Sequence, residues 1–153
     1  MTLRIASALA ALLVASTGLA LAQQMTVDIN RISSSGVGEK IGSVVVGEGK
    51  NGVSFKVSVK GLPAAQRGFH VHEKGDCGPG MKDGKMEAGI AAGDHYDPDS
   101  HKSHKGPKGK GHKGDLPLLK GNAAGIEQTV VAPRLKIADV KSRALVIHEG
   151  GDT

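Results

Sequence analysis

The sequence predicts an all-β domain, a sandwich or barrel built from short strands. Apolar and polar side chains alternate with a period of two in the first half of the mature chain, most clearly over residues 53–59. Turn signals separate the alternating segments at the short intervals expected of a sandwich or barrel. The chain also contains 23 glycines, a composition that favours turns between strands over long helices.

Four strands are expected in the first half of the domain. Residues 27–32 and 41–46 carry Val and Ile at the alternating or apolar positions typical of strands. Residues 47–52 end in Asn-Gly, a strong hairpin signal, and lead into the strand at 53–59. Residues 68–72 form the fourth expected strand.

The second half is dominated by a long segment without periodicity. Between residues 74 and 117 Gly, Pro, Asp and Lys prevail, which predicts a long loop. Such loops are uncommon in compact domains and are usually functional or disordered. Beyond it we expect three strands, at 116–119, 125–131 and 143–148. We also expect a turn at 122–125 and a short helical turn at 135–142.

The N-terminus has the features of a secretory signal. Arg4 gives a positive start, residues 5–21 are apolar, and Ala20-Leu21-Ala22 fits a small-x-small cleavage site. The apolar run is short for a membrane helix, and no other segment is long enough to cross a bilayer. We therefore expect a signal peptide at 1–22 and an exported, periplasmic domain at 23–153.

Charge and cysteine content limit the range of partners. The net charge of +5 is compatible with a nucleic acid, an anionic surface or a small anionic substrate. A nucleic-acid partner is not expected, because stacking aromatics are scarce: the chain has two Phe, one Tyr and no Trp. The single Cys77 is unusual for an exported protein and implies a free thiol, an intermolecular bond or a lost partner.

The histidines are the strongest functional signal. Imidazole is the commonest metal ligand in proteins and suits copper and zinc. His70 and His72 are two residues apart on an expected strand, so both side chains point to one face of it. His148 ends another apolar strand and would join this pair if the two strands are neighbours.

The long loop contains a second set of candidate ligands. His112 and Asp115 are three residues apart beside glycines, and one imidazole with one carboxylate from a tight turn suits zinc. His95 precedes a turn signal, Tyr96-Asp97-Pro98. His104 lies eight residues before His112, and His101 is an alternative to it. A metal would supply order that apolar burial cannot give this loop.

These residues occur in motifs that resemble the bacterial periplasmic copper–zinc superoxide dismutases. The resemblance spans residues 27–152, nearly the whole mature chain. The most specific motifs begin at Gly68, Pro79, Ala92, His104, Gly111, Ala132 and Leu145: GFHVH, PGMKDGK, AGDHYDP, HKGP, GHKGDLP, APRLK and LVIHEGGD.

The resemblance implies a fold and a role for each candidate residue. The family fold is a flattened Greek-key β-barrel of eight strands with long metal-binding loops. The implied copper ligands are His70, His72, His95 and His148. The implied zinc ligands are His95, His104, His112 and Asp115. His95 would bridge both metals and act as the catalytic proton carrier, and Asp152 would link His70 to His104 from outside the metals.

The implied reaction is the conversion of superoxide into oxygen and hydrogen peroxide. The sequence departs from the family pattern after Thr153, where relatives continue with a substrate-guiding arginine, a cysteine partner for the position of Cys77 and a last strand. Arg143 precedes the strand that ends in His148 and is not that arginine. We therefore expect a C-terminally truncated member whose activity is open. The alternative is a non-catalytic periplasmic copper- or zinc-binding protein, and a homodimer is one of the states left open.

Overall fold

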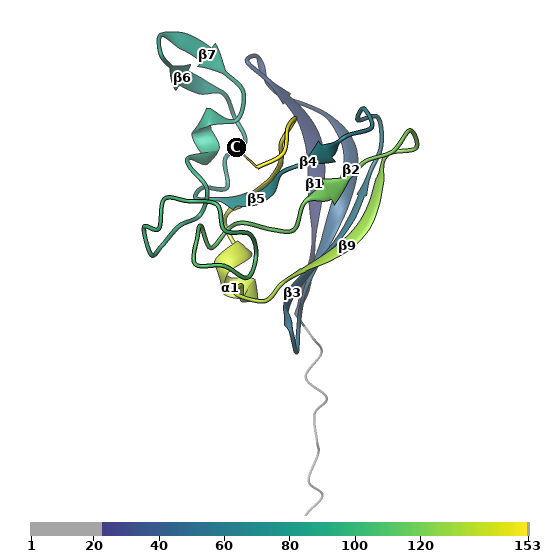
Figure 1. The fold of residues 1–153 in the computed structure, drawn as a ribbon. Coiled ribbons are helices and arrows are strands. Elements are labelled where there is room, and N and C mark those ends of the chain that lie inside the picture. Colours follow the sequence, from purple (N-terminus) through teal and green to yellow (C-terminus); the bar gives the residue numbers. More distant parts are fainter. Residues whose placement is uncertain (1–22, 153) are drawn as a thin grey trace, which may run out of the picture.

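The computed structural model describes residues 23–152, and its largest element is a curved antiparallel sheet (Figure 1). The sheet has the order β1-β2-β3-β9. These strands are β1 (Gln24–Ser33), β2 (Gly36–Gly49), β3 (Gly52–Val59) and β9 (Ile126–Ala132). The expected signal segment at 1–22 lies outside the described residues.

Short two-stranded ladders and loops make up the rest of the fold, and the β6–β7 hairpin projects away from the sheet (Figure 1). Strand β5 pairs with β10, β4 with β8, and β6 with β7, all antiparallel. Their bounds are β4 Gln66–Arg67, β5 Phe69–His72, β6 Gly80–Lys82, β7 Lys85–Glu87, β8 Leu119–Lys120 and β10 Ala144–Ile147. Two short helices complete the described part: η1 (Ile90–Ala92) and α1 (Ile137–Val140). None of the helices in residues 23–152 combines the length and the apolar character that a membrane span requires.

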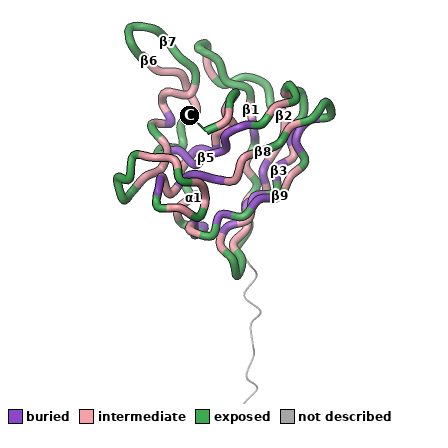
Figure 2. The backbone as a smooth tube through the Cα atoms, in the orientation of Figure 1, coloured by how far each residue is buried: buried purple, intermediate pink, exposed green. Residues whose placement is uncertain are grey.

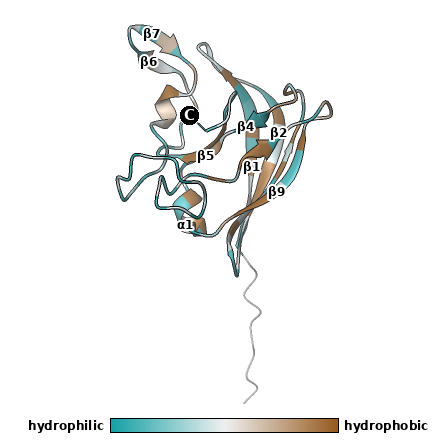
Figure 3. Cartoon of the chain, in the orientation of Figure 1, coloured by the Kyte–Doolittle hydropathy of each residue, from teal (hydrophilic) through white to brown (hydrophobic). Residues whose placement is uncertain are grey.

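The core lies between the sheet and β5. Both carry buried segments, purple in Figure 2, and hydrophobic segments, brown in Figure 3. Strand β3 supplies Val53, Phe55, Val57 and Val59, all buried, while the residues between them are more exposed. The Phe69 ring of β5 meets the Phe55 ring edge to face, with centroids 5.7 Å apart. Burial of such a side chain contributes about 1.5–3 kcal/mol. The core therefore ties the ladder that carries His70 to the main sheet.

The structure confirms the all-β fold class and most of the expected strands. The hairpin expected at 47–52 joins β2 to β3, with Asn51 in the turn. Gly52 has φ = +109°, and a Cβ atom there would lie 2.3 Å from the Ala132 carbonyl oxygen, so a side chain is excluded. The expected helical turn and the turn before β9 are also present.

Three expectations about element boundaries were wrong. The segment 74–117 contains the β6–β7 hairpin and η1 in addition to loops. The hairpin turns at Asp83-Gly84, whose φ values of 49° and 77° are those of a type I′ turn, so the Asp-Gly signal was available in the sequence. The strand expected at 116–119 is reduced to β8, and β10 ends one residue before His148.

Candidate metal centre

Strand β5 is the centre of the site. Alternation places His70 and His72 on one face and Phe69 and Val71 on the other. Phe69 and Val71 belong to the hydrophobic core, and all four residues are buried. The core therefore fixes the strand, and the strand fixes the direction of both imidazoles.

One edge of β5 brings in His148. In the β5–β10 ladder Val146 lies opposite His70 and Ala144 opposite His72. The His148 amide donates to the Gly68 carbonyl (2.9 Å), which extends this pairing past the end of β10. Residues 144, 146 and 148 share a face by alternation, so His148 joins the face of His70 and His72. Its Nε2 lies 3.3 Å from His72 Nε2.

The other edge of β5 brings in two loop segments. The Val71 amide donates to the Gly114 carbonyl (2.9 Å), and the Tyr96 amide donates to the Val71 carbonyl (2.8 Å). These bonds create isolated bridges that set His95 opposite His72 and Asp115 opposite His70. Residues directly opposite in an antiparallel pair share a face, so both loop residues join the same cluster.

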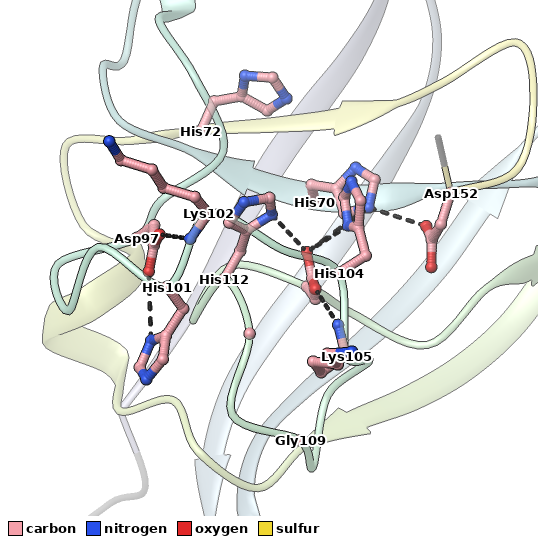
Figure 4. Close-up of polar contacts among 12 residues, drawn as sticks. His70, His72, Asp97, His101, Lys102, His104, Lys105, Gly109, His112 and Asp152 are labelled. Carbon is pink, nitrogen blue, oxygen red and sulfur yellow. Dashed lines mark hydrogen bonds and ion pairs between the residues drawn. The ribbon is translucent and has the colours of Figure 1, made fainter.

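Asp115 is where the loop ligands converge. Its side chain is fully buried, and its Oδ1 lies 3.0 Å from His104 Nδ1 and 3.4 Å from His112 Nδ1. The His112 amide donates to the Ser103 carbonyl (2.8 Å), which draws the two ends of this loop together. Figure 4 shows His70, His104 and His112 on neighbouring segments, with Asp152 facing His70.

His95 lies at the middle of the cluster. Its ring centroid is 4.0–5.3 Å from the five other imidazoles of the cluster. Two overlapping groups have ligand-capable atoms within 4.8 Å of one another: His70, His72, His95 and His148, and His70, His95, His104 and Asp115. The first group has the same members as the expected copper set. In the second, His70 stands where the expected zinc set has His112.

Outer partners fix two of the imidazoles. His72 Nδ1 lies 2.8 Å from the Gly93 carbonyl, which can only accept, so this nitrogen carries the proton and Nε2 keeps its lone pair. His70 Nε2 lies 2.9 Å from Asp152 Oδ1, so by the same reasoning the lone pair of His70 is on Nδ1. The structure thus brings Asp152 to His70, and its link to His104 stays a prediction.

The donor atoms fit the expected metals. His70 Nδ1 and His112 Nδ1 are buried without a hydrogen-bond partner in the described structure, and buried polar atoms of this kind need an explanation. His70 belongs to the expected copper set and His112 to the expected zinc set. A metal ion in each site would give each of these nitrogens a partner. Imidazole nitrogens suit copper, and imidazoles with one carboxylate suit zinc.

Desolvation keeps four imidazoles of the cluster neutral: those of His70, His72, His95 and His148. Desolvation, followed by the charges of His148 and other neighbouring imidazoles, lowers the pKa of His70 to about 3. Desolvation, followed by the charges of His70 and other imidazoles, lowers the pKa of His95 to about 2. Desolvation is also the main reason why the pKa values of His72 and His148 are lowered. Neutral imidazoles are the form that binds metals.

We expect the metal-free protein to lose stability as the pH falls from about 6.5, the ordinary histidine pKa, toward 3. In this range the unfolded chain takes up protons that folded His70 and His95 do not, so stability rises with pH. Urea unfolding of the metal-free protein at several pH values measures this slope. The variant His95→Gln should show a shallower slope, whereas His101→Gln should keep it. An unchanged slope in His95→Gln would contradict the assignment.

A groove of about 1270 Å³ opens over the cluster. Its lining includes His72, His95 and His148 of the cluster and Ile32 of β1. Lys102 also lines it, within a lining that carries both basic and acidic side chains. A small anion therefore has a route to the cluster from solvent.

Two sequence-predicted residues lie outside the cluster. His101 Nδ1 is 3.6 Å from Asp97 Oδ1, and His101 is in neither metal-binding group, so the geometry favours His104 over His101 (Figure 4). Cys77 is a free, half-buried thiol. Desolvation, together with the Asp76 charge, raises its pKa, which disfavours the reactive thiolate.

Sequence reasoning missed the close packing at two glycines. A Cβ atom at Gly114 would lie 2.3 Å from the Val71 carbonyl oxygen, and one at Gly68 would lie 3.0 Å from His70 Cε1. Both glycines let a ligand-bearing segment approach β5. Both glycines lie in the ligand motifs GFHVH and GHKGDLP, but their contacts with β5 depend on pairing between distant segments.

The chain is similar to known proteins over most of its length. Residues 40–153 match the family model described as copper/zinc superoxide dismutase (SODC). The chain is 47% identical to the superoxide dismutase [Cu-Zn] of Brucella abortus biovar 1 over 135 residues, which cover 87% of this chain and 78% of that protein. It is 47% identical to the Escherichia coli K12 protein of the same name over 142 residues, which cover 92% and 82%, respectively.

Solved structures give the same result for the fold. The Cu/Zn superoxide dismutase from Brucella abortus superimposes with a TM-score of 0.83 at 47% identity, covering 86% of each chain. The monomeric copper, zinc superoxide dismutase from Salmonella enterica superimposes with a TM-score of 0.76, also at 47% identity and 86% coverage of each chain. Sequence, fold and the histidine cluster agree, and the chain belongs to the copper/zinc superoxide dismutase family.

Proposed function

We propose that this protein is a superoxide dismutase that converts superoxide into oxygen and hydrogen peroxide at a copper–zinc centre. The observation that carries the proposal is the position of His95, whose ring contacts the imidazoles of both expected ligand sets. A side chain in this place is suited to join two metal sites. The family membership of the chain supports the same activity.

The ligand assignment forms part of the proposal. We assign copper to the His70, His72, His95 and His148 group, and zinc to His95, His104, His112 and Asp115. When bound, copper supplies reversible one-electron chemistry, and zinc supplies a fixed positive charge. We assign His112 rather than His70 to zinc because His70 Nε2 is already held by Asp152, whereas His112 Nδ1 faces Asp115 Oδ1 at 3.4 Å.

The chain's own residues control protons and access. Peroxide formation consumes protons, and His95, at the middle of the imidazole cluster, is placed to hold one on a ring nitrogen and to release it to the product. Desolvation lowers the pKa of His95 and so disfavours the doubly protonated ring. The net charge of +5 favours the approach of a small anion.

Export and architecture complete the proposal. A signal peptide at 1–22 and a single domain at 23–153 place the enzyme in the periplasm. Strands β3 and β9 pair although residues 60–125 separate them in the chain. Such a long connection between neighbouring strands supports the Greek-key barrel of the family.

Metal analysis combined with a superoxide assay tests the proposal. We expect the purified mature chain to bind one copper and one zinc and to consume superoxide only when copper is present. The zinc-only protein is the matched control and should be inactive. A folded sample that binds neither metal in stoichiometric amount would overturn the metal assignment, and a loaded but inactive sample would overturn the enzymatic one.

A further inference from the structure

Arg67 is a buried guanidinium next to the copper half of the cluster. It is 5% exposed and ends strand β4. Its Nη1 donates to the carbonyls of His148 (3.3 Å) and Glu149 (3.1 Å), and its Nη2 donates to the Pro63 carbonyl (3.0 Å). Among residues 23–152 no carboxylate oxygen lies within 4.0 Å of it. Its partners are therefore backbone carbonyls.

The segment that Arg67 holds carries two residues of the site. Residues 148–152 follow the end of β10 and have no strand partner, yet they include His148 and Asp152. Two backbone hydrogen bonds also attach this segment to Gly68. The His148 amide donates to the Gly68 carbonyl, and the Gly68 amide donates to the Gly150 carbonyl (2.7 Å). Arg67 thus donates to the His148 and Glu149 carbonyls, which accept no backbone hydrogen bond in the ladder.

Arg134 makes a similar set of contacts in the zinc half. It lies between β9 and α1, is half-buried and also has no carboxylate within 4.0 Å among the described residues. Its guanidinium donates to the carbonyls of Gly109, Gly111 (3.1 Å) and His112 (3.4 Å). The backbone held in this way packs tightly, because a Cβ atom at Gly111 would lie 2.3 Å from the Ser103 carbonyl oxygen.

We propose that Arg67 and Arg134 are positioning residues, each of which holds the backbone around an imidazole that belongs to only one of the two expected metal sets. Arg67 positions His148 for copper, and it acts on His70 through Asp152 in the same segment. Arg134 positions His112 for zinc. The inference rests on the proposed metal sites and adds to them which basic residue controls which metal.

The physical reason is the shape of the guanidinium. Arginine offers five donors in a rigid plane, so one side chain can reach carbonyls on two separate segments. A lysine ammonium is a single point of charge and cannot cover the same directions. Outer partners that fix a ligand typically change metal affinity by about 10–100-fold when they are removed. We therefore expect each substitution to change the affinity for only one of the two metals by this factor.

The test compares Arg67→Met and Arg134→Met in the full mature chain. We expect Arg67→Met to weaken copper binding about 10–100-fold and to shift the Cu²⁺ electron paramagnetic resonance spectrum, while zinc affinity changes by less than about threefold. Arg134→Met should do the reverse, with the altered visible spectrum of Co²⁺ bound in place of zinc as its readout. Arg67→Lys should restore the charge but only part of the copper affinity.

Controls separate positioning from general destabilisation. Lys56→Met removes an exposed cationic side chain on β3 that does not line the groove over the cluster, and it should leave both spectra unchanged. Circular dichroism of each metal-free variant reports whether it folds, and the lysine variants serve if a methionine variant does not. Equal weakening of both metals, or unchanged spectra in both variants, would overturn the inference. Failure of the unsubstituted protein to bind metal would instead overturn the proposed function.

Discussion

Replacing His148 with alanine is expected to remove copper from the purified protein while zinc stays bound. His148 belongs to the copper group only, and its Nε2 faces His72 Nε2 at 3.3 Å. Loss of an outer partner already costs about 10–100-fold in affinity, so loss of a ligand should cost at least about 100-fold. Superoxide consumption should fall to the level of the zinc-only protein. Elemental analysis after dialysis against a weak chelator measures both metals in one sample.

The reciprocal variant is Asp115→Asn, which keeps the shape of the side chain but removes its charge. Asp115 Oδ1 is the point where His104 and His112 meet, so zinc should be lost while copper is largely retained. His101→Ala serves as the control for both variants, since His101 is in neither group, and it should retain both metals. If His148→Ala and Asp115→Asn lose both metals equally, the assignment of separate ligand sets is wrong.

Replacing Phe55 with alanine is expected to cause the largest loss of stability of any single core substitution discussed here. Phe55 is fully buried and packs edge to face against Phe69, the residue before His70. Removal of a buried Phe side chain costs about 3–5 kcal/mol, which is a large part of the stability of a domain this small. Urea or thermal unfolding of the metal-free protein measures the change.

The matched control for this prediction is Val131→Ala on the neighbouring strand β9. Val131 is 42% exposed, so its replacement should change the free energy of unfolding by no more than about 0.5 kcal/mol. Phe55→Leu should fall between the two variants, because it leaves a smaller cavity. A loss below about 1 kcal/mol in Phe55→Ala would show that the Phe55–Phe69 contact does not tie the metal ladder to the sheet.

Most strands follow directly from local pattern. The alternation in β3 exposes Lys56 and buries Phe55 and Val57, as a period of two requires. The failures have local causes as well. The β6–β7 hairpin was hidden by its exposed, polar strands, although Asp83-Gly84 is a strong turn signal. Strand β8 is short because only Leu119 and Lys120 find a partner, in β4.

Local sequence pattern is enough to identify the available ligands and to put His70 and His72 on one face, because strand alternation is a local property. That His148 and Asp115 reach the same face depends on the folded chain, since each pairs with β5 across tens of residues of intervening chain. The folded chain also sets the carbonyl partners of Arg67 and Arg134. A guanidinium bonds to any carbonyl within reach, so the sequence around it carries no record of its partners.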